Sequence, residues 1–150
     1  FPGYNYRMTD IQAALGISQL KKLDRFVKKR REIADAYNGF FGESEYFEIP
    51  QEKKYAESSW HLYPIRLKVK FIKNKAPIFN MLRGKGICLQ VHYIPVYMHP
   101  YYRDLGYRQG LCPNAEKFYR REISIPMYPA MSNKDINMVA NGIIEVFDRL

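Results

Sequence analysis

At 150 residues, 47% of them hydrophobic and 15% aromatic, the chain is long enough to bury an ordinary core, and a single domain is expected. It has no apolar stretch near the roughly 20 residues that a membrane span requires, and its two cysteines, Cys88 and Cys112, are too few and too far apart for a disulfide framework or a clustered metal site. The formal charge of +9 admits an anionic partner, such as nucleic acid, an anionic membrane or a phosphorylated substrate.

The start of the chain has neither an initiator methionine nor the pattern of a signal peptide. Phe1 opens the sequence, and no charged start followed by an apolar run is present. We therefore expect a further part of the protein upstream of residue 1 and a reducing, cytoplasmic setting.

The first predicted element is a long helix over residues 9–40. Thr9 and Gln12 have the spacing of a capping box, and Asp10 adds a favourable charge near the helix N-terminus. Beyond them, apolar residues recur at steps of three, four or seven and form one stripe that should face a partner: Ile17, Leu20, Leu23, Val27, Ala34, Tyr37 and Phe41. A helix of this length can connect two parts of a larger molecule.

The middle of the chain changes to a mixture of strand and helix patterns. Residues 42–59 are polar and suit a linker, and apolar residues then alternate over 60–69, which predicts a strand. Helical spacing over 75–83 ends at a glycine-rich breaker, and residues 87–93 are predicted to form a second strand.

The last third begins with an aromatic segment and ends in a helix. Residues 94–112 carry two prolines and four tyrosines and predict an irregular loop with at most a short helical turn. A helix should follow over 113–121 and a short strand over 123–125. Ser132 suits the N-cap of a final helix, with Asp135 in its first turn. This alternation indicates an α/β chain with a small sheet covered by helices.

No self-contained active site is visible in these patterns. The three histidines lack neighbours at metal-ligand spacing, so no metal site is predicted, and no glycine-rich phosphate loop is present. The basic run KKRR at residues 28–31 could bind nucleic acid. On a helix, however, four consecutive residues spread around most of a turn, which favours a solvated face. A basic module for nucleic acid or another polyanion remains an alternative.

The segment GYNYRMTDIQAA at residues 3–14 closely resembles the G-Y-N-[YF]-R-[ML]-[TS] motif of the DegT/DnrJ/StrS-type sugar aminotransferases, which are fold-type-I pyridoxal-phosphate enzymes. The resemblance continues in the same order along most of the chain, at SQL (18–20), RREIA (30–34), WHLY (60–63), VHYIP (91–95), PNAE (113–116) and ISIP (123–126). Several anchors in the right order are much more specific than any one of them.

The resemblance implies a fold and a division of the chain. Residues 1–41 would be a connecting segment with the long helix, and residues 42–150 the small C-terminal domain, with a mainly antiparallel sheet covered by helices. The large domain that holds pyridoxal phosphate would lie upstream. The Schiff-base lysine precedes the GYN motif in the family, so we expect no catalytic lysine in this chain.

The resemblance also implies roles for four residues. Asn5 matches the asparagine that reaches across the dimer to the cofactor phosphate of the neighbouring subunit, and its alternative role is that of a turn residue. Arg7 is a candidate ligand for the diphosphate of a nucleotide-sugar, because a guanidinium can bind two phosphate oxygens, and its alternative is a solvated charge. His92 and Tyr93 match a pair that lies near the substrate's phosphates, although a lone histidine is often structural.

By the same resemblance, the complete enzyme would be a homodimer that transfers an amino group from glutamate to the 4-keto group of a nucleotide-linked 6-deoxy sugar. Within the family, VHYIP (91–95) and HPYYR (99–103) are most similar to aminotransferases of the pseudaminic acid pathway, which act on a UDP-linked 4-keto-N-acetylhexosamine. No nucleic-acid or membrane partner is then expected. Some relatives dehydrate sugars and others regulate, which leaves a dehydratase or a regulatory protein as an alternative.

Overall fold

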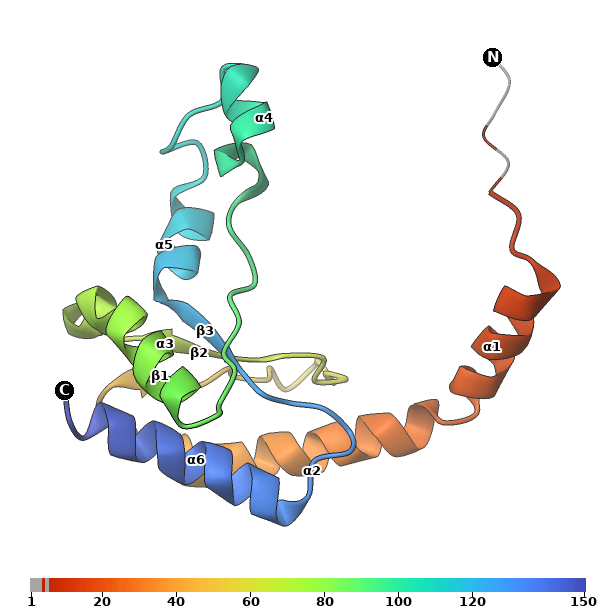
Figure 1. Ribbon diagram of the computed structural model, residues 1–150, viewed down its shortest axis with the longest axis horizontal. Helices are drawn as coiled ribbons and strands as arrows, with labels where there is room; N and C mark the ends of the chain where they lie inside the picture. The colour runs from red at the N-terminus through yellow and green to blue at the C-terminus, as the bar shows by residue number, and fades with distance from the viewer. Residues whose placement is uncertain (1–3, 5) are drawn as a thin grey trace.

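The computed structural model describes residue 4 and residues 6–150, which form a small sheet, several helices and two projecting segments (Figure 1). In chain order the α-helices are α1 (Asp10–Leu20), α2 (Leu23–Phe41), α3 (Lys75–Gly84), α4 (Pro100–Asp104), α5 (Pro113–Arg121) and α6 (Asn133–Phe147). The strands are β1 (Phe47–Glu48), β2 (Tyr63–Leu67) and β3 (Glu122–Ile125), and short 3-10 helices cover Val69–Asn74 and Val96–Met98.

The three strands form one antiparallel sheet in the order β1-β2-β3. Because successive side chains of a strand point to opposite faces, paired residues divide the sheet into two faces. The apolar face carries the pairs Phe47 with Leu67, Tyr63 with Ile125 and Ile65 with Ile123. The opposite face carries Glu48 with Arg66, Pro64 with Ser124 and Arg66 with Glu122. One face of this sheet is therefore built for a core and the other for polar contacts.

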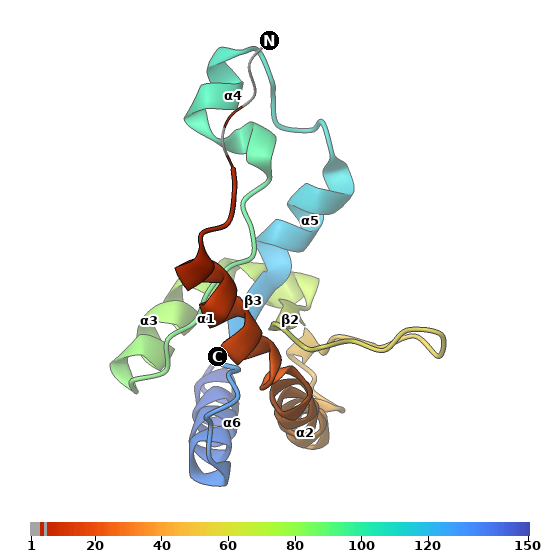
Figure 2. The same ribbon diagram turned by 90° about the vertical axis from the view of Figure 1, so that its right-hand side faces the viewer.

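The core lies where α2 and α6 meet the apolar face of the sheet, and both helices run side by side there (Figures 1 and 2). The ring of Tyr37 in α2 meets Tyr63 edge-on at 5.1 Å, and Phe147 of α6 lies 4.9 Å from Phe47 between ring centroids. Tyr37 donates from its hydroxyl to the carbonyl of Pro126 at 2.8 Å. Aromatic packing with satisfied hydroxyl groups thus joins both helices to the sheet.

The predicted continuous helix over 9–40 is wrong, because the chain turns at Lys21 and Lys22 and forms two helices instead. The amide of Lys22 donates to the carbonyl of Gln19 at 2.9 Å, which closes α1. No proline or glycine marks this break, so periodicity alone could not reveal it. The apolar stripe also divides: Ala34, Tyr37 and Phe41 are buried, whereas Ile17, Leu20 and Leu23 are exposed within the described chain.

The predicted strand over 87–93 is also wrong. Only one bridge forms there, in which the amide and carbonyl of Gln90 pair with Ser124 of β3 at 3.0 and 2.9 Å. Ile87 and Leu89 are buried in the core, so their alternation reflects burial and not a ladder. The polar stretch 42–59 contains β1, a two-residue strand too short to give a pattern.

Several of the other predicted elements are confirmed. The strand over 60–69 contains β2, the helices over 75–83 and 113–121 correspond to α3 and α5, and 123–125 lies in β3. Both predicted caps form: Thr9 and Gln12 make a reciprocal capping box, as do Ser132 and Asp135. The sheet is small and antiparallel and helices cover it, as expected, although the leading helix is broken.

The two projecting segments leave the body in different places (Figures 1 and 2). One is the N-terminal segment with α1. The other is an arm formed by residues 96–112, which includes α4. Within the described residues, no helix combines the length and apolar character needed to cross a membrane.

Candidate functional site

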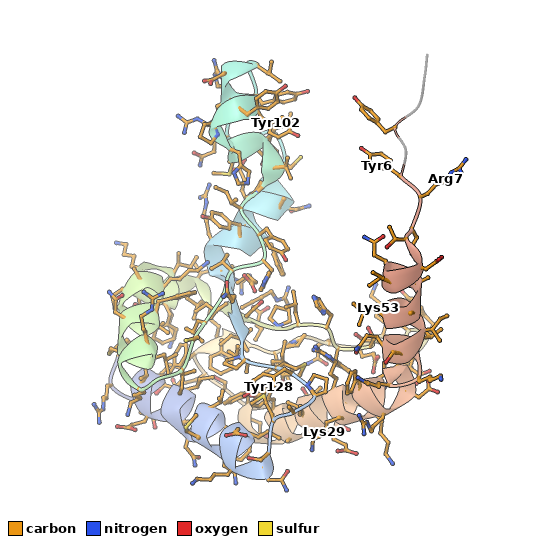
Figure 3. The ribbon with its side chains drawn as sticks, turned by 45° about the vertical axis from the view of Figure 1, so that its right-hand side comes forward. Tyr6, Arg7, Lys29, Lys53, Tyr102 and Tyr128 are labelled. Atoms are coloured by element: carbon orange, nitrogen blue, oxygen red, sulfur yellow. The ribbon has the colours of Figure 1, made fainter. Side chains whose placement is uncertain are left out.

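Arg7 lies on the extended segment that leads into α1. It is exposed, and together with Tyr6, Met8 and Gln12 it lines an open pocket of about 530 Å³. Figure 3 shows Tyr6 and Arg7 pointing to opposite sides of the segment. Asn5, the proposed cofactor ligand, lies outside the described residues.

The chemistry of this pocket can be compared with what a phosphorylated ligand requires. Arg7 supplies a cation with several donors and Gln12 an amide, although the side-chain oxygen of Gln12 accepts from the amide of Thr9 at 2.9 Å. A guanidinium suits the oxygens of a phosphate, whereas the four lining residues include no amine that could bind an aldehyde. The lining therefore fits the phosphate end of pyridoxal phosphate or of a nucleotide, and not the cofactor's aldehyde.

His92 lies beside the polar face of the sheet. The bridge between Gln90 and Ser124 aligns its segment antiparallel to β3, so that His92 comes opposite Glu122. Its backbone amide donates to the Glu122 carboxylate, with Oε2 at 2.9 Å, in place of a main-chain partner. This bond fixes the backbone of His92 against β3.

The His92 ring is held by a second contact to the same strand. Nδ1 lies 2.8 Å from Oγ of Ser124, and the Ser124 hydroxyl donates in turn to Oε1 of Glu122. Glu122 and Ser124 are two residues apart and share one face of β3, as the period of a strand requires. Sequence reasoning missed both residues, yet a charged residue and a serine alternating with Ile123 and Ile125 were a signal that β3 has a polar face.

Tyr93 follows His92 and presents its ring to solvent. The side chain is 70% exposed, and its ring meets that of His92 edge-on, with 4.5 Å between centroids. His92 is therefore held against the sheet, whereas the side chain of Tyr93 is exposed.

Positive charge lies close to the Glu122 carboxylate. Lys75, at the start of α3, donates from its ammonium to the carbonyl of Tyr119 at 2.7 Å. Burial lowers the pKa of Lys75 below its ordinary value, and the charge of Glu122 opposes that shift. Arg66 is paired with Glu122 in the register of the sheet and also forms an ion pair with Glu48 at 2.9 Å.

The basic run at 28–31 is not the uniformly solvated face that was expected. Arg30 donates from one nitrogen to the carbonyls of Trp60, His61 and Met127 at 3.1, 2.8 and 3.2 Å. Arg31 donates to the carbonyl of Ser58 and pairs with Glu57 at 3.2 Å. Lys29 also pairs with Glu32 at 3.4 Å, so three of the four cations are engaged by the chain itself, which weakens the interpretation of this run as a nucleic-acid surface.

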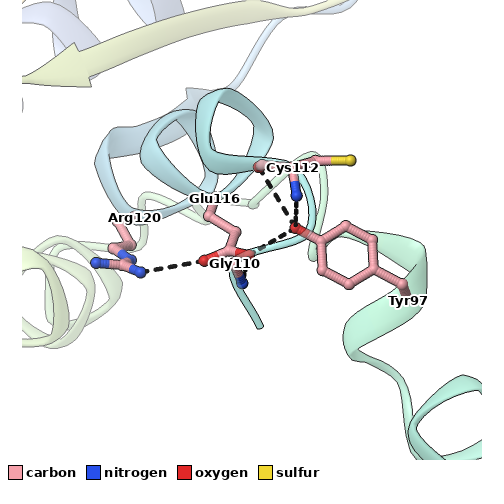
Figure 4. Close-up of polar contacts among 5 residues, drawn as sticks. All are labelled: Tyr97, Gly110, Cys112, Glu116 and Arg120. Atoms are coloured by element: carbon pink, nitrogen blue, oxygen red, sulfur yellow. Dashed lines mark hydrogen bonds and ion pairs between the residues drawn. The ribbon is translucent and has the colours of Figure 1, made fainter. Parts of the chain in front are cut away.

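The arm is anchored by a buried carboxylate, that of Glu116 in α5 (Figure 4). Oε1 accepts from the Tyr97 hydroxyl at 2.7 Å and from the amide of Gly110, while Oε2 accepts from Arg120 at 3.3 Å. The Tyr97 oxygen also accepts from the amide of Cys112 at 3.2 Å. These bonds join both ends of the arm to α5.

Arg7 and the His92–Tyr93 pair are not brought together within one chain. His92 contacts β3, whereas the segment with Arg7 rises beyond α1, away from the sheet (Figures 1 and 3). A single ligand could meet both only if another part of the protein or a second subunit contributes to the site. In the described part of the chain, no group of three or more His, Cys, Asp or Glu residues is placed to hold a metal ion.

Comparison with known proteins adds a family and several close relatives. Residues 1–144 match the model of the DegT/DnrJ/EryC1/StrS aminotransferase family. The UDP-4-amino-4,6-dideoxy-N-acetyl-beta-L-altrosamine transaminase of Campylobacter jejuni is 42% identical over 148 residues, which cover 99% of this chain and 39% of that protein.

Solved structures match as well. Helicobacter pylori PseC, an aminotransferase involved in the biosynthesis of pseudoaminic acid, is similar with a TM-score of 0.91 and 37% identity, over 99% of this chain and 40% of that one. The PLP-form of Spr1654 from Streptococcus pneumoniae gives a TM-score of 0.91 at 29% identity, over 99% and 38% of the two chains. The chain thus spans about two fifths of the length of these proteins.

Proposed function

The chain belongs to the DegT/DnrJ/EryC1/StrS aminotransferase family, and we propose that the intact protein is a pyridoxal-phosphate-dependent aminotransferase that acts on a nucleotide-linked sugar in the cytoplasm. The observation that carries this proposal is the match over residues 1–144, together with 42% identity to a transaminase of a UDP-linked amino sugar. Residues 1–41 would connect a large upstream domain to a small domain formed by residues 42–150.

The proposed reaction exchanges an amine for a ketone. Glutamate gives up its amino group and becomes 2-oxoglutarate, while the 4-keto carbon of a UDP-linked 6-deoxy-N-acetylhexosamine becomes a carbon bearing an amine. When bound, pyridoxal phosphate supplies the electron sink for this exchange. The finer choice of sugar rests on the identity to the Campylobacter jejuni transaminase and on the similarity to PseC.

The residues of this chain would bind and orient the reactants. Asn5 would hold the cofactor phosphate of the neighbouring subunit, with its amide as donor. Arg7 would bind the diphosphate of the sugar nucleotide through its guanidinium. His92 and Tyr93 would meet the same part of the substrate. Arg7 lies on the segment that rises beyond α1, away from the sheet that holds His92 (Figure 3), so one substrate would contact both residues if a second subunit completed the site; this supports a homodimer.

The experiment uses the intact protein, purified with pyridoxal phosphate and supplied with glutamate and the UDP-linked 4-keto sugar. Mass spectrometry should detect the 4-amino sugar together with an equal amount of 2-oxoglutarate. The same sugar linked to GDP or dTDP serves as the control for nucleotide choice. A deoxygenated keto sugar with no amine incorporated would instead support a dehydratase, and absence of any turnover with cofactor bound would favour a regulatory role.

The basic-module alternative is tested by titrating the intact protein with DNA and RNA. Tight binding that weakens steeply with salt would support it, because counterion release dominates such complexes. The engagement of Arg30 and Arg31 by the chain's own carbonyl groups argues for indifference to nucleic acid.

A further inference from the structure

The carboxylate of Glu122 is fully buried on the polar face of the sheet and is used at both oxygens. Oε2 accepts from the backbone amide of His92 at 2.9 Å, and Oε1 accepts from the Ser124 hydroxyl. Ser124 is itself only 2% exposed. Both oxygens of this carboxylate therefore act as hydrogen-bond acceptors.

The direction of these bonds determines where the hydrogen of the His92 ring lies. A serine hydroxyl has a single hydrogen, and Ser124 donates it to Glu122. The Ser124 oxygen can therefore only accept from the His92 ring, 2.8 Å away, so Nδ1 must carry a hydrogen. The remaining nitrogen, Nε2, is then the ring atom left for a ligand, as in sites where a second partner sets the tautomer of a histidine.

We propose that Glu122 and Ser124 are positioning residues that hold His92 in its Nδ1-protonated form and present Nε2 to the nucleotide-sugar. The proposal rests on the proposed function, in which His92 contacts the substrate near its diphosphate. If the ring becomes cationic there, Nε2 carries a hydrogen for a phosphate oxygen, and Glu122 supplies the opposite charge through Ser124. The backbone and ring are both fixed before the substrate arrives, which lowers the entropic cost of binding.

The substitution Glu122→Gln separates positioning from a purely structural role. The glutamine side chain has nearly the same shape as the glutamate. Its amide oxygen must face the backbone N–H of His92, because its NH₂ group at that place would meet another hydrogen-bond donor. Its NH₂ group then faces Ser124 and donates to Oγ. The Ser124 hydroxyl is left to donate to Nδ1, so the hydrogen of the neutral His92 ring should move to Nε2. All three hydrogen bonds are kept, and the two that involve Ser124 reverse their direction, while the His92 backbone amide remains a donor.

The test is made on the intact protein labelled with nitrogen-15 in histidine, at about pH 8, well above the ordinary imidazole pKa of about 6.5. Long-range proton–nitrogen correlation distinguishes the two ring nitrogens, and His92→Gln identifies the His92 signals by their loss. We expect the Nδ1-protonated pattern in the wild type, the Nε2-protonated pattern in Glu122→Gln, and a mixture in Ser124→Ala. Glu145→Gln, a partly exposed carboxylate on α6, is the control and should leave the pattern unchanged.

An unchanged Nδ1-protonated pattern in a folded Glu122→Gln protein would overturn the proposal. If that variant does not fold, Ser124→Ala decides between the two outcomes. This substitution removes the hydroxyl that links the His92 ring to Glu122 and keeps the buried carboxylate. Loss of a fixed tautomer supports the proposal, and an unaltered tautomer in Ser124→Ala overturns it.

Steady-state kinetics then separates this proposal from the proposed function. Both Glu122→Gln and Ser124→Ala remove the link between the ring and the Glu122 charge, so the phosphate would meet a neutral ring in place of a cationic one. Because this part of the substrate is remote from the 4-keto carbon, the sugar KM should rise roughly 2- to 10-fold, with kcat within about twofold. A changed tautomer without any change in KM would support the positioning of His92 and remove His92 from the proposed substrate site.

Discussion

Gly142 of α6 lies directly against Ile87, at the start of the segment that leads to His92. A Cβ atom placed on Gly142 would come within 2.5 Å of Cδ1 of Ile87, whose side chain is 2% exposed. The missing side chain of Gly142 therefore allows this segment to lie close to α6. Ile87 packs there three residues before the bridge between Gln90 and Ser124 begins.

Gly142→Ala should destabilise the protein by about 1 kcal/mol, because overpacking costs about 1–3 kcal/mol and the gain in helix propensity is at most about 1 kcal/mol. Ile87→Val removes the methyl group that the new Cβ would meet. In that background Gly142→Ala should be neutral or stabilising in urea unfolding. Strictly additive effects of the two substitutions would show that the two residues do not compete for space.

Alkaline pH should destabilise the fold through two buried tyrosines. Burial raises the pKa of Tyr37 and of Tyr63 well above the ordinary value, and both hydroxyls donate, to Pro126 and to Asn38. Because their pKa values are raised in the folded state, the two tyrosines contribute fully to the free energy of unfolding below the ordinary tyrosine pKa of about 10. This contribution is lost as the pH rises beyond that value. Denaturant midpoints measured from pH 8 upward should fall above about pH 10.

Tyr37→Phe and Tyr63→Phe test the origin of that loss. Each should cost about 1 kcal/mol at neutral pH through its missing hydrogen bond, and each should flatten the alkaline decline. Tyr55→Phe is the control, since this tyrosine is 84% exposed. If stability fell as steeply with pH in both variants as in the wild type, the alkaline loss of stability would have to come from other groups.

The arm at 96–112 should loosen when Glu116 is removed. The hydrogen bonds from Tyr97, then from the Gly110 amide, lower the pKa of Glu116. A lowered pKa means that the anchorage is present above the ordinary glutamate range and is lost as the pH falls through the pKa of the folded state. Glu116→Ala should therefore raise amide hydrogen exchange across the arm at neutral pH, whereas Arg120→Ala, an exposed partner, should have little effect. Equal exchange in both variants would contradict this anchorage.

Arg7→Ala should weaken binding of the sugar nucleotide in the intact protein. A charged hydrogen bond to phosphate is worth about 1.5–3 kcal/mol, which corresponds to a roughly 10- to 150-fold higher KM. The glutamate half-reaction should be nearly unchanged, because the diphosphate takes no part in it. Arg25→Ala, which removes another exposed arginine, is the control. Equal losses in both half-reactions would mean that Arg7 supports the fold or the cofactor.

Asn5→Ala should weaken cofactor retention in the neighbouring subunit of the dimer. Mixed dimers combine this change with a substitution of the upstream catalytic lysine. If Asn5 acts across the dimer, two changes on different chains leave one working site, and two changes on one chain leave none. Activity that does not depend on this arrangement would contradict the cross-subunit role.

Elements marked by residues close together in the sequence could be predicted. The capping boxes at Thr9 and Ser132 depend on residues three positions apart, and the alternation of β2 reports directly on its buried face. The break at Lys21 and Lys22 has no such signal. Residues 33–41 are helical against a core, whereas α1 has no buried residue among those described, and a pattern of spacing cannot distinguish the two situations.

The candidate site was predictable only in part. Asn5 and Arg7 came from a motif, and His92 with Tyr93 from a resemblance. Glu122 and Ser124 are far from His92 in sequence, and their connection to it depends on the single bridge at Gln90, which no local pattern specifies. Burial of Ile87 and Leu89 in the core produced the apolar alternation that resembles a strand.

The contacts of Arg30 bear on how the sequence can vary. Its guanidinium donates to three carbonyls from two separate loops, whereas its neighbour Lys29, among the residues that the structure describes, pairs with Glu32 of the same helix. A planar group with several fixed donors can do this, and a single ammonium on a flexible stem replaces it poorly. Lysine and arginine should therefore exchange freely at position 29 among relatives but not at position 30, although the two residues are adjacent and carry the same charge.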